Sequence, residues 1–295
     1  MRILITGGNG QLGRELKKQL TEGGCSLGPV PARYQGAVVE AIDIEELDLT
    51  DKWAVKEFIR NGSYDIVFNC AAYTNVDGCE SHQQEAYKVN ALAPYYLAQA
   101  CEKTETHLMQ VSTDYVFSGD AQWPQAEYEV PNPISVYGKT KLAGENFVRQ
   151  SCSRAFIVRT AWLYGDGKNF VKTILRVAKE KGTVKVVNDQ FGNPTSSVDL
   201  AYHMLRIADG APYGIYHATN EGICSWYEFA KAIVEKAGID AEVLPCTTEE
   251  YPTPTKRPAY SALDNLALRA TVGNNFRPWE VALDEYIKLW KEQEE

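Results

Sequence analysis

The sequence predicts an α/β protein in which a doubly wound parallel sheet is joined to a smaller C-terminal part. Short apolar runs alternate with segments whose apolar residues recur at helical spacing, as in parallel β-α-β units. The runs are continuously apolar, which is typical of strands covered on both faces. A glycine-rich segment, Thr6-Gly-Gly-Asn-Gly-Gln-Leu-Gly13, joins the first apolar run to the first helical pattern.

The first half is expected to hold five strands joined by helices. The apolar runs place strands at residues 3–5, 37–42, 65–69, 107–112 and 155–159. Helices are expected at residues 12–20, 51–61 and 82–103 and from Tyr137 onward. The first helix is predicted because Leu12, Leu16 and Leu20 lie four residues apart. Residues 21–36 are rich in Gly and Pro and predict a loop.

The second half is less regular. Its expected elements are a helix around residues 170–177, a strand at 184–187, helices at 197–209 and 225–237, and two closing helices. The Pro-rich residues 245–258 predict a long connection of the kind that often carries function. We therefore expect residues 1–165 to form mainly a dinucleotide-binding domain and residues 166–295 mainly a substrate-binding part, with some interleaving.

Composition excludes several classes of partner. The 295 residues carry 30 Lys and Arg against 39 Asp and Glu, a formal charge of −9, which disfavours nucleic acid or an anionic membrane. The seven cysteines form no C-x-x-C pair and predict reduced thiols in a cytoplasmic protein. No apolar stretch predicts a membrane helix, and the four isolated histidines predict no metal site.

The glycine-rich segment predicts a Rossmann-type site for a dinucleotide. Gly7 can make the tight turn, Gly10 lets the backbone approach a pyrophosphate, and Gly13 lets the helix pack close to the sheet. The helix N-terminus then offers N–H groups to the phosphates. The spacing is G-x-x-G-x-x-G, which departs from G-x-G-x-x-G, and the alternative is a plain strand-to-helix turn.

Acidic residues after the second strand are the candidates for the adenosine end. Asp43 is expected to hold the ribose hydroxyls and would favour NAD, because a carboxylate repels a 2′-phosphate. Arg14 offers the opposite choice, since it could accept the 2′-phosphate of NADP. Asp48 could reach the adenine amine, or it could serve only as a helix cap near Asp51.

Tyr137-Gly-Lys-Thr-Lys141 places a phenol and an ammonium on one face of a helix. A nearby positive charge stabilises a phenolate and lowers its pKa, so the pair could exchange a proton with a carbonyl or alcohol. The spacing alone is more typical of a solvated helix face. Its functional interpretation therefore depends on the glycine-rich segment upstream.

Four short motifs occur together in one known family. They are Thr6-Gly-x-x-Gly-x-x-Gly13, Asn69-Cys-Ala-Ala72, Ser112-Thr113 and Tyr137-x-x-x-Lys141. In these residues the chain resembles the extended short-chain dehydrogenase/reductase family. Longer blocks covering almost the whole chain resemble members that reduce nucleotide-linked keto sugars: residues 71–77, 111–117, 136–145, 159–164, 188–195 and 251–258.

The resemblance implies reduction of the C4 keto group of dTDP-4-dehydro-6-deoxy-L-mannose to dTDP-L-rhamnose by NADPH or NADH. Tyr137 would protonate the C4 oxygen as hydride arrives, and Thr113 would hydrogen-bond the same oxygen. Lys141 would lower the pKa of the phenol and hold the nicotinamide ribose. The resemblance also implies a homodimer by analogy.

The other implied site residues fall into two groups. The cofactor group is Gly7, Gly10, Gln11, Leu12, Gly13, Asp43, Asp48, Leu49, Ala71, Ala72, Tyr73, Tyr137 and Lys141. The substrate group is Asp114, Trp162, Asn169, Gln190 and Arg257. Without the resemblance, Trp162 would be interpreted as a core aromatic and Arg257 equally well as a surface arginine. Asn90 matches a helix asparagine linked to the family's active site, or makes only a local polar contact.

Several other functions are compatible with parts of the same pattern. Related dehydratases carry a glutamate directly after the Thr-Asp of this block, where this chain has Tyr115, so elimination lacks one of its proton-transfer groups. An epimerase, or a reductase of another 4-keto sugar, would use the same Tyr137 and Lys141. A non-catalytic regulatory subunit resembles these reductases too, but the retained Thr113, Tyr137 and Lys141 argue against it.

Overall fold

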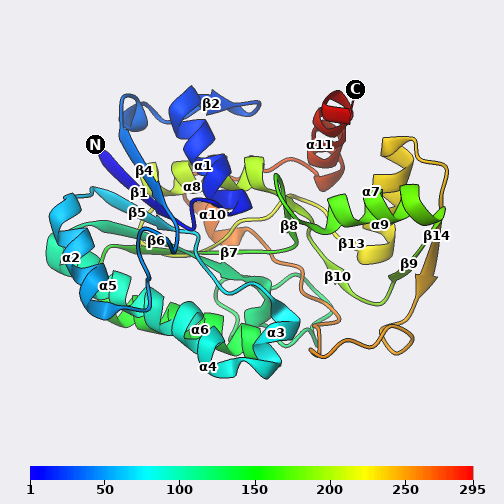
Figure 1. Ribbon diagram of the computed structural model, residues 1–295, viewed down its shortest axis with the longest axis horizontal. Coiled ribbons are helices and arrows are strands. Elements are labelled where there is room, and N and C mark those ends of the chain that lie inside the picture. The colour runs from blue at the N-terminus through cyan, green and yellow to red at the C-terminus, as the bar shows by residue number, and fades with distance from the viewer. Residues whose placement is uncertain (295) are drawn as a thin grey trace.

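The central sheet of the protein has six parallel strands, seen in a computed structural model that describes residues 1–294 (Figure 1). Their order across the sheet is β12 (Gly214–His217), β7 (Ala155–Thr160), β6 (His107–Thr113), β5 (Ile66–Asn69), β1 (Arg2–Thr6) and β4 (Val38–Ile42). The chain leaves β1 in one direction to reach β4 and then crosses back to β5 on its other side. This reversal makes a crevice beyond the carboxyl ends of β1 and β5, where doubly wound sheets bind ligands.

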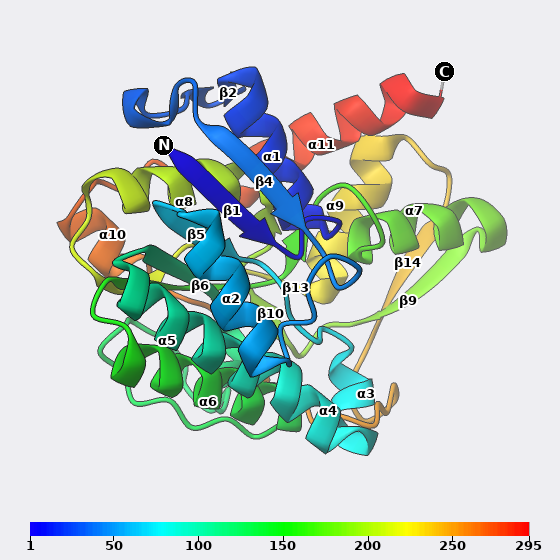
Figure 2. The ribbon, with the colours of Figure 1, turned by 60° about the vertical axis from the view of Figure 1, so that its left-hand side comes forward.

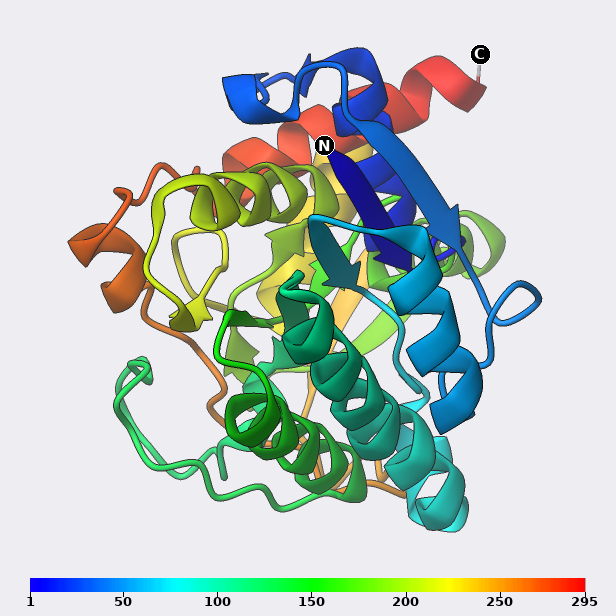
Figure 3. The same ribbon diagram turned by 90° about the vertical axis from the view of Figure 1, so that its left-hand side faces the viewer.

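Helices cover both faces of this sheet, as Figures 2 and 3 show. One face is packed by α1 (Gln11–Glu22), α8 (Ser197–Gly210) and α10 (Leu266–Ala270), and the other by α2 (Lys52–Gly62), α5 (Ala93–Thr104) and α6 (Val136–Ser151). Successive residues of β1 alternate between the two layers: Ile3 and Ile5 join the first core and Leu4 the second. The predicted doubly wound α/β fold is confirmed.

A smaller cluster lies beyond the carboxyl ends of the strands. It is built from α7 (Phe170–Lys181), α9 (Trp226–Ala237) and α11 (Trp279–Glu294), with β9 (Thr183–Val187) paired to β14 (Glu242–Cys246). Short pairs connect it to the sheet: β8 (Leu163–Tyr164) with β11 (Thr195–Ser196), and β10 (Phe191–Gly192) with β13 (Cys224–Ser225). None of the helices within residues 1–294 is long and apolar enough to cross a membrane.

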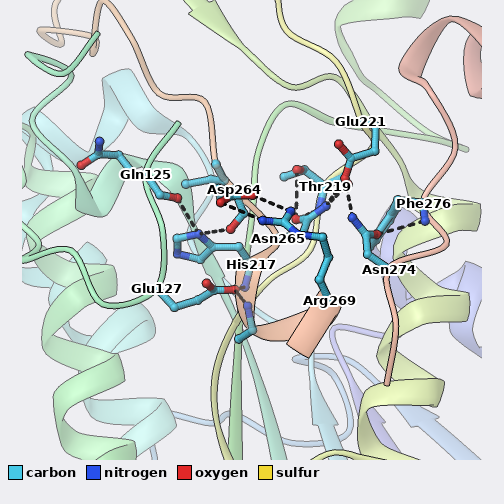
Figure 4. A network of polar contacts seen from close by, with 12 residues as sticks. Gln125, Glu127, His217, Thr219, Glu221, Asp264, Asn265, Arg269, Asn274 and Phe276 are labelled. Atoms are coloured by element: carbon cyan, nitrogen blue, oxygen red, sulfur yellow. Dashed lines mark hydrogen bonds and ion pairs between the residues drawn. The ribbon is translucent and has the colours of Figure 1, made fainter. Parts of the chain in front are cut away.

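A network of hydrogen bonds connects β12 to the loops around it (Figure 4). The Glu127 carboxylate accepts hydrogen bonds from the N–H groups of His217 (2.8 Å) and Ala267 (3.1 Å). His217 Nδ1 lies 2.9 Å from the carbonyl oxygen of Gln125 and 3.2 Å from that of Asp264. Carbonyl oxygens only accept, so Nδ1 carries a proton and donates it. Burial, and then the Arg159 guanidinium, lower the pKa of His217 to about 3, so the imidazole is neutral at neutral pH.

Several elements differ from the sequence-based expectation. The helix expected at 82–103 consists of α4 (Gln83–Tyr87), the π-helical turn η2 (Lys88–Leu92) and α5, and α3 (Val76–Ser81) precedes it. The loop expected at 21–36 contains a hairpin of β2 (Gly24–Cys25) and β3 (Gly28–Pro29) and the 3-10 turn η1 (Ala32–Tyr34). β12 was not anticipated, and β14 reaches into the Pro-rich connection.

Candidate active site

A cavity of about 800 Å³ lies beyond the carboxyl ends of β1, β4, β5, β6 and β7. Most of the predicted site residues line it: Gly7, Gly10, Gln11, Leu12, Gly13, Asp43, Asp48, Leu49, Ala71, Ala72, Thr113, Asp114, Tyr137, Lys141 and Trp162. Because parallel strands end at the same edge of a sheet, residues more than 150 positions apart meet there. The cavity is large enough for a dinucleotide with part of a second ligand.

Glycine is required at two points of the loop after β1. Gly7 has φ +68°, and a Cβ there would lie 2.7 Å from the Ala71 backbone nitrogen. A Cβ on Gly13 would lie 2.3 Å from the Gly7 carbonyl oxygen, so only glycine lets α1 pack this closely. Within the described residues, no side chain caps α1 at Gly10. The N–H groups of its first turn are therefore available to a pyrophosphate.

Asp43 stands at the end of β4 with its carboxylate fixed by the backbone. It accepts hydrogen bonds from the N–H groups of Asn9 (3.0 Å) and Ile44 (2.9 Å), while Glu46 accepts from the N–H of Asp43 (2.8 Å). Arg14 is engaged elsewhere: it donates to Asp166 through Nε (3.1 Å) and to the Asn9 carbonyl. This end of the cavity thus presents the Asp43 carboxylate, while Arg14 is paired with Asp166.

The end of β6 and the start of α6 bring the three predicted catalytic residues to one wall of the cavity. Ser135 caps α6 by accepting from the Gly138 N–H (3.1 Å), which places Tyr137 in the first turn. Gly138 packs against η3 (Asp114–Val116), since a Cβ there would lie 2.1 Å from the Tyr115 carbonyl oxygen. One turn later, buried Lys141 donates from Nζ to the Val111 carbonyl on β6 (2.7 Å).

Electrostatics at this wall favour a protonated phenol. Burial, and then the Asp114 carboxylate, raise the pKa of Tyr137, whereas a hydrogen bond with Thr113 lowers it. The expectation of a lowered phenol pKa is therefore wrong for this structure, because desolvation of the phenolate dominates. A phenol that keeps its proton at neutral pH is a proton donor, as carbonyl reduction requires.

Asp114 is itself a buried acid beside the phenol. Thr113 donates from its hydroxyl to Asp114 Oδ1 (2.9 Å), and Oδ2 is buried without a partner among the described residues. Burial raises the pKa of Asp114 to about 6. Burial also lowers the pKa of Lys141 to about 8, while the neighbouring Glu145 carboxylate raises it. At neutral pH the wall thus holds a carboxylate, a neutral phenol and an ammonium.

Trp162 enters the cavity from a strained backbone. Its φ is +46°, a left-handed conformation that costs a non-glycine residue on the order of 1–3 kcal/mol. Its indole stacks on Trp226, with ring centroids 3.6 Å apart and planes 7° from parallel, and a Cβ on Gly192 would lie 2.5 Å from the ring. Trp226 also lines the cavity, although it is not among the predicted site residues. Its position at the start of a helix, 64 residues after Trp162, gave no signal.

Four predicted site residues lie outside the residues that line the cavity. Asn169 caps α7 by accepting from the Lys172 N–H (3.0 Å) and donates to the Gly165 carbonyl (2.5 Å). Gln190 donates to the Thr248 hydroxyl (3.0 Å), and Arg257 pairs with Asp77 on α3 (3.4 Å). Tyr73, the fourth, is held by Asn90.

Asn90 makes a double bridge within the described residues. In the π-helical turn η2, its side chain accepts from the Tyr73 N–H (2.8 Å) and donates to the Tyr73 carbonyl (3.1 Å) and the Thr140 hydroxyl (3.2 Å). π-Helical turns are frequent at functional sites. Thr140 directly precedes Lys141, so Asn90 supports the wall of the cavity from behind rather than entering it.

Comparison with known proteins finds similarity to nucleotide-sugar reductases over nearly the full chain. The family described as RmlD substrate binding domain matches residues 1–291. A dTDP-4-dehydrorhamnose reductase of Mycolicibacterium smegmatis is 40% identical, covering 97% of this chain and 85% of the relative. The crystal structure of a dTDP-4-dehydrorhamnose reductase from Clostridium acetobutylicum is 49% identical with a TM-score of 0.94, covering 99% of this chain and 100% of the other.

A further reductase structure bears on the cofactor. The dTDP-4-dehydrorhamnose reductase of Bacillus anthracis, solved in complex with NADP, is 37% identical with a TM-score of 0.89, covering 97% of this chain and 98% of the other. Its bound nucleotide agrees with the glycine loop and uncapped helix seen here. A family match that begins at the first strand and ends within the last helix leaves one conclusion: the chain belongs to the RmlD substrate binding domain family.

Proposed function

We propose that the protein reduces the C4 keto group of dTDP-4-dehydro-6-deoxy-L-mannose to give dTDP-L-rhamnose, with NADH or NADPH as hydride donor. Tyr137 gives its proton to the C4 oxygen, and the Thr113 hydroxyl, which donates to Asp114 in this structure, hydrogen-bonds the same oxygen. Lys141 supplies positive charge as the oxygen becomes negative. A nicotinamide bound beside the glycine loop would supply the hydride.

The observation that carries this proposal is the placement of Thr113, Tyr137 and Lys141 on the same cavity as the glycine loop. The names of the relatives support the choice of sugar nucleotide. Tyr115, whose ring packs edge-on against Tyr137 at 5.6 Å, stands where a dehydratase needs a second acid. The chain therefore has the groups for one proton transfer beside one hydride transfer.

Steady-state turnover tests the proposal directly. The purified protein is incubated with the dTDP-linked keto sugar, generated in place by the preceding dehydratase and epimerase reactions, and loss of NADH or NADPH absorbance is followed. Oxidation of the cofactor with formation of dTDP-L-rhamnose is expected. Folded protein that consumes neither cofactor would contradict the proposal and favour a regulatory subunit.

The epimerase alternative makes a different prediction about the cofactor. An epimerase must retain its nucleotide through both half-reactions, whereas a reductase releases the oxidised form after each turnover. NAD bound stoichiometrically after gel filtration, with interconversion of a UDP-sugar, would favour the epimerase. Exchangeable cofactor would favour the reductase.

Asp43 is expected to set the preference between NADH and NADPH. Asp43→Asn removes the charge but keeps an oxygen for the Asn9 N–H, so the ratio of kcat/KM for NADH to that for NADPH should fall roughly tenfold, equivalent to about 1.4 kcal/mol. Glu45→Gln, an exposed neighbour outside the cavity, is the matched control. An unchanged ratio would refute this role, and a selective loss of NADPH use in Arg14→Gln would transfer it to Arg14.

Trp226 is expected to matter for substrate affinity through Trp162. Trp226→Ala removes the stacked partner, worth about 0.5–1.5 kcal/mol, so KM for the sugar nucleotide should rise several-fold with a smaller change in kcat. Trp226→Phe should keep most of the affinity because it preserves a ring against Trp162. Equal KM values for wild type and Trp226→Ala would show that the stack serves only the core.

Three further proposals rest on the family resemblance. We propose a homodimer, which light scattering of the purified protein tests.

We propose a cytoplasmic location, supported by the seven cysteines, all of which are free thiols. We also propose the functional division near residue 165, with Asn169, Gln190 and Arg257 serving the nucleotide end of the substrate.

A further inference from the structure

A buried ion pair lies directly behind the catalytic wall. Arg159 on β7 donates to Glu145 on α6 through Nη2 (2.7 Å) and Nε (2.9 Å), and each side chain is only 2% exposed. Glu145 follows Lys141 by one helical turn, so its carboxylate and the ammonium share a face of α6. Neither member of the pair is among the predicted site residues.

Every charged group of this pair has its partners inside the fold. Ser112, which pairs in register with Arg159 across β6 and β7, donates to Glu145 Oε1 (2.5 Å). Arg159 Nη1 faces Nε2 of His217 at 3.4 Å, and the neutral tautomer fixed by the network of Figure 4 makes Nε2 an acceptor. The Phe117 ring lies 5.3 Å from the guanidinium.

Such a pair needs an explanation beyond stability. Taking two charges out of water costs about as much as their attraction returns, and apolar side chains of similar volume often stabilise a fold as well or better. Here the pair occupies the layer between α6 and the sheet, one turn from Lys141, where an apolar core would leave the ammonium without a counter-charge.

Lys141 depends on that counter-charge. It is 4% exposed and donates to the neutral Val111 carbonyl, so desolvation lowers its pKa to about 8. The Glu145 carboxylate on its own helix is the principal group that raises it, and the Cys70 thiol after β5 adds a smaller effect. On the sheet side, Arg159 of β7 holds the Glu145 carboxylate through the ion pair.

We propose that Glu145 is a positioning residue that keeps Lys141 in its ammonium form, and that Arg159 limits this effect by holding the carboxylate on the sheet side. The inference rests on the proposed function, because the ammonium matters to a reductase that stabilises a developing alkoxide. The proposed role of Glu145 and Arg159 differs from a purely structural role in one measurable respect. Removing the negative member and removing the positive member must change Lys141 in opposite directions.

The test measures the titration of Lys141 by NMR in protein with 13C-labelled lysine and no added cofactor, with the resonance assigned from Lys141→Met. Glu145→Gln should move the midpoint from near pH 8 downward by roughly one unit, since an opposite charge shifts a pKa by about that much or more. Arg159→Met should move it upward. Ser112→Ala, which removes a hydrogen bond from Glu145 but no charge, should leave it in place.

Kinetics provide the second readout. The alkaline limb of kcat/KM, which reports the free enzyme, should follow the NMR midpoint in each variant. The proposal is overturned if the Lys141 titration of both variants superimposes on that of the wild type. It is also overturned if Glu145→Gln and Arg159→Met shift the midpoint in the same direction. If one variant fails to fold, the direction of the shift in the other decides alone. Shifted titrations in protein without turnover would instead refute the proposed function and leave the coupling between Glu145 and Lys141 intact.

Discussion

Replacing Tyr137 with phenylalanine is expected to lower kcat by about 10²- to 10⁴-fold, the usual contribution of a positioned general acid. The ring, its edge-on contact with Tyr115 and the start of α6 at Ser135 are all retained, so only the transferable proton is lost. Affinity for NADH, measured by fluorescence titration, should stay within about twofold because the cofactor loop is untouched.

Tyr95→Phe supplies the control for loss of a phenol hydroxyl. Tyr95 lies on α5 against Phe147, with ring centroids 4.9 Å apart, and is not among the residues that line the cavity. Its variant should turn over like the wild type. If Tyr137→Phe were to keep more than a tenth of the wild-type kcat, the proton would have to come from another group, and Asp114 would be the next candidate.

Gly13→Ala is expected to weaken NADH binding by about 10- to 100-fold, with a matching fall in thermal stability. The added methyl would lie 2.3 Å from the Gly7 carbonyl oxygen, a backbone atom that cannot move without displacing the loop. Overpacking of this kind costs about 1–3 kcal/mol, and 1.4 kcal/mol is tenfold in affinity. Isothermal titration with NADH measures the loss.

A second glycine-to-alanine change separates the effect on the cofactor loop from any general effect of adding a methyl group to a helix. Gly210 ends α8, where a Cβ would lie 3.4 Å from the Val272 side chain. Gly210→Ala should leave NADH affinity unchanged. Equal affinities in the two variants would show that close packing of α1 on the loop is not needed for the cofactor.

Much of the fold could be predicted because its information is local. Ile3, Leu4 and Ile5 are apolar on successive positions since the two helical layers each receive alternate side chains. The start of α6 and the uncapped glycine start of α1 depend on residues within one turn. The expected 82–103 helix was wrong in detail, because the π-helical turn at Asn90 is fixed by Tyr73 and Thr140, which lie outside that window.

β12 shows why other elements could not be predicted. Gly214-Ile-Tyr-His217 is too short and mixed to be distinguished from a loop, and it is a strand because β7 offers an edge and Glu127 accepts the His217 N–H. Tertiary contacts decide such segments more than their own composition.

The residues of the candidate site also fall into those that could be predicted from the sequence and those that could not. Thr113, Tyr137 and Lys141 could be named from the sequence because each belongs to a short motif. Trp226 and Arg159 could not, because they act through partners 64 and 14 residues distant in the chain. The pKa of Tyr137 was predicted in the wrong direction because spacing shows which charge is near but not how much water is excluded.

The late arrival of β12 has a consequence for synthesis of the protein. On the ribosome, at ~10 residues per second, about 20 s pass between β1 and the last strand of the same sheet. For the last ~6 s of that interval, after residue 160 has been made, β7, whose six residues are all buried in the finished fold, has an unpaired edge. The α8 helix that covers α1 and the sheet is also still missing for most of this time. The nascent N-terminal half thus exposes this strand edge until residue 217 has been made.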